Sequence, residues 1–198
     1  MQNSTSKVRV LTGTAMLGAV AAVLMYLEFP IPIMPAFVKL DVSELPALIA
    51  SFAYGPVSGI LVCLIKNLIK LPSTSTAAVG ELFNFVMGAL FVGVAGLIYK
   101  RNKTRKGAIA GALLGALVMA VVSVPYNYFI VYPAYVVMYH LPLDAIIGMY
   151  QAINPNVNGL LACLLVFNLP FTFVKGALDA ALCFLVYKPL SPILHGRK

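Results

Sequence analysis

Long apolar runs separated by short polar breaks occupy most of this 198-residue chain. Hydrophobic residues make up 61% of the sequence and charged residues only 10%, whereas soluble domains carry about 25% charged residues. In lipid a backbone must satisfy its own hydrogen bonds, as an α-helix does. The residue alternation of β-barrel strands is absent from the sequence. We therefore predict an all-α integral membrane protein, with residues 1–198 forming a single domain.

Six apolar runs are candidates for membrane-spanning helices. Their approximate bounds are 8–28, 44–54, 56–71, 77–99, 107–136 and 159–187. The second run is short, because at about 1.5 Å per residue it covers only about half of the hydrocarbon core. Residues 44–71 could therefore form either one kinked helix or two helices that meet at Gly55-Pro56.

The distribution of basic residues favours two helices. Ten of the fourteen Lys and Arg residues lie at the N-terminus, within residues 100–106 or at the C-terminus. Cytoplasmic segments are enriched in Lys and Arg, and an even number of spans places all three clusters on the same side. We predict a six-helix bundle with both termini in the cytoplasm. The net charge of +8 then reflects orientation in the lipid bilayer rather than binding to nucleic acid.

The same topology gathers polar side chains in the outer half of the bundle. Polar groups in lipid are costly and tend to face a cavity or one another. We therefore predict an outward-facing pocket covered by the long first outer loop, residues 29–43. The polar side chains concerned are Lys66, Lys70, Glu81, Asn84, Tyr126, Asn127, Tyr128, Tyr132, Asn168, Thr172 and Lys175.

A series of short motifs follows in order along most of the chain: EFPIP, FVKLD, SELPALIASFAYGP, LIKNLIKL, VGELFNF, GLIYKR, LPLDAI, AINPNVN and PFTFVKG. Together they resemble the riboflavin-specific substrate-binding (S) components of energy-coupling factor (ECF) vitamin transporters. The resemblance implies a subunit of a prokaryotic cell membrane that captures the vitamin outside with high affinity. It also implies partners, namely a membrane coupling (T) protein and two ABC ATPases, and a loaded S component that topples to release the vitamin inside.

The resemblance implies ligand contacts from the FVKLD loop, which contains Lys39, Leu40 and Asp41, and from Asn84, Asn127 and Lys175. One position departs from the family's pattern. Thr172 stands three residues before the lysine, where the family has asparagine. Threonine keeps a hydrogen-bond donor and an acceptor but has a shorter reach.

The chemistry of riboflavin adds further candidates. The vitamin is neutral, with a flat aromatic ring system and a polyhydroxyl chain, so its site needs apolar walls and a few amide or hydroxyl partners. Tyr128, Asn168 and Thr172 supply such groups. A phosphate ligand would favour arginine clusters, and the predicted spans contain no arginine apart from Arg9, at the very edge of the first span.

Two of the predicted lysine contacts have purely structural alternatives. Lys175 and Asp179 are four residues apart and could pair on one face of a helix. Lys39 and Asp41 could likewise pair within a solvated loop. Either pairing would remove the need for a ligand to explain the charge.

The remaining polar residues have alternatives as well. Glu81 is expected to neutralise Lys66 or Lys70, and Asn168 could satisfy carbonyls freed by a kink at Pro170. At least two of three tyrosines are expected in the interfacial aromatic belt; they are Tyr126, Tyr128 and Tyr132.

Small residues at four-residue spacing allow helices to approach closely. In the first span Ala15 and Ala19 show this spacing, and the family resemblance implies that they dock on the T protein. The alternative is packing inside the bundle. The same spacing recurs in the fifth span, where internal packing is expected, at Gly107, Gly111 and Gly115.

The sequence offers no support for an enzyme. It has two histidines, no carboxylate pair at metal-ligand spacing and no Walker A pattern. The three cysteines lie in apolar runs without CxxC spacing and are interpreted as small buried residues. No cofactor is expected apart from riboflavin as the transported ligand. The alternatives are an S component for another vitamin or flavin, and a self-sufficient secondary transporter, which usually shows internal repeats.

Overall fold

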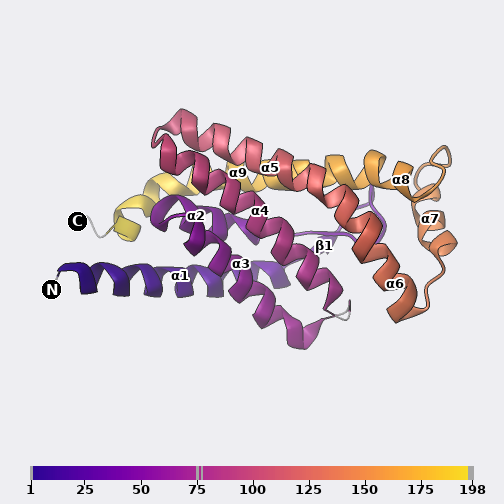
Figure 1. Ribbon diagram of the computed structural model, residues 1–198, viewed down its shortest axis with the longest axis horizontal. Coiled ribbons are helices and arrows are strands. Elements are labelled where there is room, and N and C mark those ends of the chain that lie inside the picture. The colour runs from indigo at the N-terminus through magenta and orange to yellow at the C-terminus, as the bar shows by residue number, and fades with distance from the viewer. Residues whose placement is uncertain (1, 75, 77, 196–198) are drawn as a thin grey trace.

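Helices make up most of the computed structural model, which describes residues 2–74, 76 and 78–195 (Figure 1). The helices pack lengthwise into a bundle that includes a two-stranded antiparallel pair, β1 (Phe29–Pro30) and β2 (Lys39–Leu40). The helices are α1 (Gln2–Tyr26), α2 (Glu44–Tyr54), α3 (Pro56–Lys70), α4 (Val79–Arg101), α5 (Arg105–Tyr126), α6 (Tyr132–Tyr139), α7 (Leu143–Gln151), α8 (Leu160–Cys163) and α9 (Leu169–His195). The chain is therefore mostly helical, as the sequence predicts.

Five helices in the described part of the chain are long and apolar enough to cross a membrane. They cover Lys7–Tyr26, Pro56–Ser73, Val79–Arg101, Arg105–Met138 and Leu160–Tyr187. The helix α2 has 11 residues and is too short to cross a bilayer by itself. Six crossing segments and cytoplasmic termini therefore stay predictions.

The structure divides residues 44–71 into two helices at Gly55. Gly55 has a φ of 107°, in a region of backbone conformation that glycine adopts without steric cost. Pro56 then occupies the first position of α3, where its missing N–H would have had no partner within the helix. The segment 140–158, for which no helix was predicted, contains α7.

Two short π-helices interrupt the later membrane helices, and both precede a proline. The first, η2 (Asn127–Val131), ends two residues before Pro133, and the second, η3 (Leu164–Asn168), ends two residues before Pro170. A proline in a helix lacks a donor and clashes with the carbonyl four residues earlier, and a wider π turn accommodates both defects. The two π-helices place Asn127 and Asn168 at the same cavity.

Small residues on α5 allow α4 to approach closely. A Cβ atom built at Gly111 would lie 2.8 Å from the carbonyl oxygen of Ala95, and one at Gly115 would lie 2.5 Å from that of Phe91. Both carbonyls belong to α4, so these glycines pack inside the bundle, as the sequence predicts. Gly107 lies against Asn102, in the turn between the same two helices.

We expect the substitution Gly115→Ala to lower the free energy of unfolding by about 1–3 kcal/mol, because the new methyl group overpacks a backbone contact. Thermal unfolding of the purified protein in detergent would measure the change. Gly148→Ala is the matched control, because a Cβ atom at this helical position meets nothing within 4 Å. Equal stability of the two variants would contradict the close α4–α5 contact.

Candidate functional site

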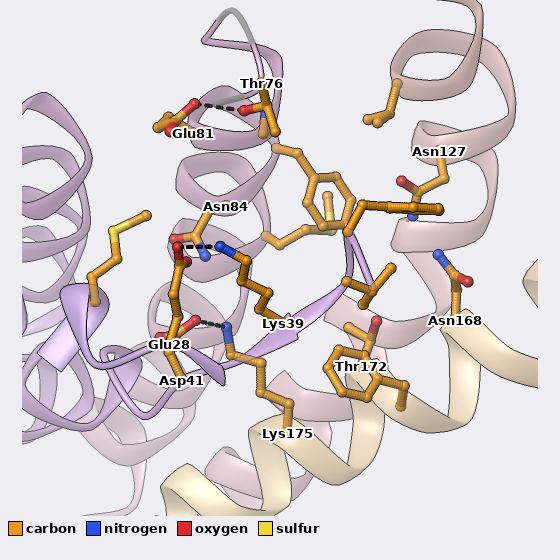
Figure 2. Close-up of a pocket in the computed structure, with 18 of the residues that line it drawn as sticks. Glu28, Lys39, Asp41, Thr76, Glu81, Asn84, Asn127, Asn168, Thr172 and Lys175 are labelled. Atoms are coloured by element: carbon orange, nitrogen blue, oxygen red, sulfur yellow. Dashed lines mark hydrogen bonds and ion pairs between the residues drawn. The ribbon is translucent and has the colours of Figure 1, made fainter. Parts of the chain in front are cut away.

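A cavity opens between the α1–α2 loop and the ends of α4, α5 and α9 (Figure 2). Its lining combines three kinds of group: apolar and aromatic side chains, neutral amides and hydroxyls, and paired charges. Seven of the nine predicted ligand-binding residues line it, namely Lys39, Asp41, Asn84, Asn127, Asn168, Thr172 and Lys175. Residues from five separate helices and strands thus meet where the sequence predicts a pocket.

Two predicted ligand-binding residues do not line the cavity. Leu40 follows Lys39 in β2, and successive side chains of a strand point to opposite faces. Tyr128 is 39% exposed and packs edge-on against Phe129, which is itself exposed. These positions argue against direct ligand contact by either residue.

A buried network of charges closes one side of the cavity. The Nζ atom of Lys175 lies 2.8 Å from Asp41 Oδ2 and 3.3 Å from Glu44 Oε2. The Nζ atom of Lys66, which is fully buried, lies 2.6 Å from Glu44 Oε1 and also donates to the hydroxyl of Ser43. Asp41 in turn accepts hydrogen bonds from the backbone and hydroxyl of Ser43. The network fastens the α1–α2 loop to α3 and α9.

The lysines determine the protonation of Asp41, which lies in the loop between α1 and α2. Burial by itself would raise the pKa of this carboxyl group. The ammonium groups of Lys175 and Lys66 outweigh that effect and hold the pKa well below its usual range. Asp41 is therefore a carboxylate at neutral pH and a firm anchor for Lys175.

Both local pairings considered from the sequence are wrong. Lys175 reaches Asp41, 134 residues away in the chain, rather than Asp179. Asp179 is fully buried, and neither carboxyl oxygen has a hydrogen-bond partner among the residues that the structure describes. Lys39 pairs with Glu28 instead of Asp41.

A second group of charges lies beside the first, around Glu28 (Figure 2). Glu28 Oε1 accepts hydrogen bonds from Lys39 Nζ at 2.9 Å and from Lys70 Nζ at 3.3 Å. Lys70 also lies over the ring of Tyr26, with its Nζ atom 4.2 Å from the ring centroid. The carboxylate of Glu28 is therefore the shared hydrogen-bond acceptor and counter-charge of both Lys39 and Lys70.

Glu81 has partners different from those that the sequence suggests. Its Oε2 atom accepts hydrogen bonds from the hydroxyls of Thr74 at 2.7 Å and Thr76 at 2.9 Å. It does not neutralise Lys66 or Lys70, which pair with Glu44 and Glu28. Hydroxyl donors thus hold a negatively charged group at this edge of the cavity.

Aromatic residues build the end of the cavity around Asn168. The hydroxyl of Tyr150 donates to Asn168 Oδ1 at 2.7 Å and shares a hydrogen bond with the hydroxyl of Tyr132. Phe37, from the α1–α2 loop, meets Tyr132, Tyr135 and Tyr150 edge to face at 6.2–6.4 Å between ring centroids. The side chain of Asn168 therefore orders these rings and does not satisfy carbonyls at the proline kink.

The three tyrosines considered for the aromatic belt have different places. Tyr132 is 1% exposed and lines the cavity. Tyr126 packs against Phe83, with ring centroids 5.7 Å apart. Burial therefore excludes Tyr132 from an aromatic belt, whereas Tyr128 is exposed and Tyr126 is partly exposed. A belt position for Tyr126 and Tyr128 stays a prediction.

Sequence reasoning missed several residues of the site. Phe37 lies within the FVKLD motif and Glu28 within EFPIP, so both motifs carried the signal without singling out these side chains. Tyr150 lies on α7, in a segment with no predicted helix, and no local pattern indicates its burial.

Neither Asn127 nor Thr172 forms a side-chain hydrogen bond with any other residue of the described ranges. Their amide and hydroxyl groups are available to a ligand.

Comparison with known proteins gives consistent results. The family model for the substrate-specific component of ECF transporters matches residues 9–187. The chain is 34% identical to the riboflavin transporter RibU of Staphylococcus aureus (strain TCH60) over 180 residues, which are 91% of this chain and 89% of that protein. It is 33% identical to the riboflavin transporter FmnP of Bacillus subtilis (strain 168) over 195 residues, 97% of each chain.

A solved structure is also similar along nearly its whole length. It is described as "Structure and mechanism of the S component of a bacterial ECF transporter", and it matches with a TM-score of 0.73 and 32% sequence identity. The match covers 98% of this chain and 99% of that chain. The relatives are named as transport components rather than enzymes, in agreement with the sequence motifs.

Proposed function

Because the chain belongs to the family of substrate-specific components of ECF transporters, we propose that it is the riboflavin-binding subunit of an ECF-type importer. Family membership makes it a multi-pass protein of a bacterial cell membrane and a transport component. The observation that carries the choice of ligand is the cavity, which combines an aromatic end with neutral amide and hydroxyl groups. The relatives named riboflavin transporters support the same choice.

The two ends of the cavity suit the two parts of riboflavin. The flat ring system packs among Phe37, Tyr132 and Tyr135, which offer ring edges and faces. Figure 2 places Asn127 and Asn168 on this side and Asn84, Lys39 and Glu28 on the other. The ribityl chain then extends toward the second side, where amide and charged groups can exchange hydrogen bonds with its hydroxyls.

The α1–α2 loop serves as the lid of the pocket in this proposal. It contributes Phe37 to the aromatic end and Lys39 to the polar end. The ion pair between Asp41 and Lys175 holds the end of the loop against α9. The vitamin enters when the loop lifts and is enclosed when the loop returns.

Import further requires the T protein and the two ATPases that the family uses. Ala15 and Ala19 lie on the exposed face of α1. The internal contacts of α1 come from its other face, where a Cβ atom built at Gly13 or Gly18 would collide with Tyr54 or Ile65. This arrangement supports docking of the T protein on Ala15 and Ala19 rather than packing inside the bundle.

We expect the substitution Lys175→Ala to weaken riboflavin binding by about 1–3 kcal/mol, because a buried hydrogen bond is lost and Asp41 loses its partner. Quenching of riboflavin fluorescence by the purified protein would measure the dissociation constant. Val174→Ala is the matched control, since Val174 is its neighbour on α9 and is 61% exposed. Unchanged affinity in Lys175→Ala would remove Lys175 from the binding site.

The ligand assignment itself is tested on protein purified from cells grown with riboflavin. Denaturation should release a compound with the visible absorption spectrum of a flavin. Failure to detect a flavin, together with no binding of added riboflavin, would contradict the assignment of riboflavin as the ligand. The protein would then be known only as a member of its family.

A further inference from the structure

Glu28 holds two lysines of the cavity with a single carboxylate oxygen. Its Oε1 atom lies 2.9 Å from Lys39 Nζ and 3.3 Å from Lys70 Nζ, and all three residues line the cavity. We infer that Glu28 determines specificity by excluding phosphorylated forms of the ligand from this cavity. The inference rests on the proposed function, because it concerns the phosphate ester of the same flavin.

Two ammonium groups that face one cavity are a ready site for a phosphate group. A phosphomonoester carries about −1.5 to −2 charges near neutral pH and offers strong acceptor oxygens. Lysine is a common partner of such groups. Here the carboxylate of Glu28 occupies the position between Lys39 and Lys70 that a phosphate oxygen would take.

The other charges of the cavity leave no cation to replace these two. Of the charged side chains in the described lining, three are lysines and four are carboxylates. Lys175, the third lysine, pairs with Asp41 and Glu44. Glu81 adds a further carboxylate, whose hydrogen-bond partners among the described residues are the hydroxyls of Thr74 and Thr76. A dianion would therefore meet repulsion, whereas a neutral polyol can donate its hydroxyls to the same carboxylates.

Glu28 is expected to contribute less to holding the fold than Glu44 does, although its second partner, Lys70, is only 11% exposed. The side chains of Lys39 and Glu28 are 37% and 24% exposed, and exposed ion pairs contribute little to stability. This contrasts with Lys66 and Glu44, whose side chains are 0% and 3% exposed. A carboxylate at this partly open position affects what enters the cavity more than it affects folding.

The test compares riboflavin with its 5′-phosphate, FMN. Dissociation constants for both are measured by fluorescence quenching in the wild type, in Glu28→Gln and in Glu81→Gln. In Glu28→Gln the ratio of the FMN constant to the riboflavin constant should fall by about tenfold or more, since two lysines become free for the phosphate. Added salt should reduce this gain. Glu81→Gln removes the same charge but frees no lysine, so the ratio should fall much less.

Three results would overturn the inference. The first is an unchanged ratio of the two dissociation constants in Glu28→Gln, and the second is an equal fall of this ratio in Glu28→Gln and Glu81→Gln. The third is a fall of the ratio that persists when Lys39→Met and Lys70→Met are added to Glu28→Gln.

If Glu28→Gln does not fold, Lys70→Met alone tests the inference. Lys70→Met removes one of the two ammonium groups beside Glu28, so the carboxylate should repel the phosphate of FMN more strongly. FMN should then bind more weakly relative to riboflavin, and tighter FMN binding would contradict the inference. A wild type that binds no riboflavin would instead overturn the proposed function, and the inference with it.

Discussion

The substitution Lys66→Met is expected to lower the free energy of unfolding by about 3–5 kcal/mol, since removing one partner leaves a buried charge uncompensated. Lys66 is fully buried on α3, and its Nζ atom lies 2.6 Å from Glu44 Oε1. It also helps to keep Asp41 ionised. Without Lys66, two carboxylates would share the single ammonium group of Lys175. Unfolding by SDS in mixed micelles would measure the loss.

A second substitution separates the lost charge from the lost volume. In Lys66→Met/Glu44→Gln both members of the pair are neutral, so most of the stability should return. Leu68→Met, on the same helix and 53% exposed, is a control for substitution on α3. If Lys66→Met changes stability no more than Leu68→Met, the buried network is not holding the α1–α2 loop to α3.

The substitution Ala19→Trp is expected to abolish riboflavin uptake by cells while leaving riboflavin binding intact. A bulky ring on a surface of small residues prevents close approach of a partner helix. Ala19 itself lies on the exposed face of α1 and does not touch the cavity. Uptake of labelled riboflavin by whole cells and quenching titrations on the purified protein measure the two properties separately.

The control for Ala19→Trp is Leu113→Trp on α5, which adds the same ring at an exposed position of a different helix. Its uptake should be close to that of the wild type. Normal uptake in Ala19→Trp would contradict docking through α1. Joint loss of binding and uptake would show instead that this face of α1 belongs to the core.

The position of the pocket was predictable because exposing a polar side chain to lipid carries a high free-energy cost. Asn84, Asn127, Asn168 and Lys175 stand out in apolar runs, and counting basic clusters placed them at one depth. The structure brings them to a single cavity. Composition and the predicted topology were therefore enough to bring these side chains together at one cavity, although not to describe their contacts.

The contacts within the site depend on tertiary structure that local patterns do not encode. Spacing suggested Lys175 with Asp179, yet the loop brings Asp41 to Lys175 across 134 residues. The aromatic end depends on Tyr150, whose helix α7 lies in a segment of mixed polarity. The orientations of Asn127 and Asn168 depend on π-helices before Pro133 and Pro170. Proline marks a defect in the sequence, but it does not reveal which residue the defect reorients.

Titration of riboflavin with the purified protein is the most direct test of riboflavin binding in this cavity. Binding among the rings of Phe37, Tyr132 and Tyr135 should quench flavin fluorescence, and the quenching should saturate at one riboflavin per chain. The substitution Lys175→Ala should shift the curve to higher concentrations, and Val174→Ala should not. A wild type that quenches no riboflavin fluorescence, and that carries no flavin from the cells in which it was made, would contradict the proposal that this cavity binds riboflavin.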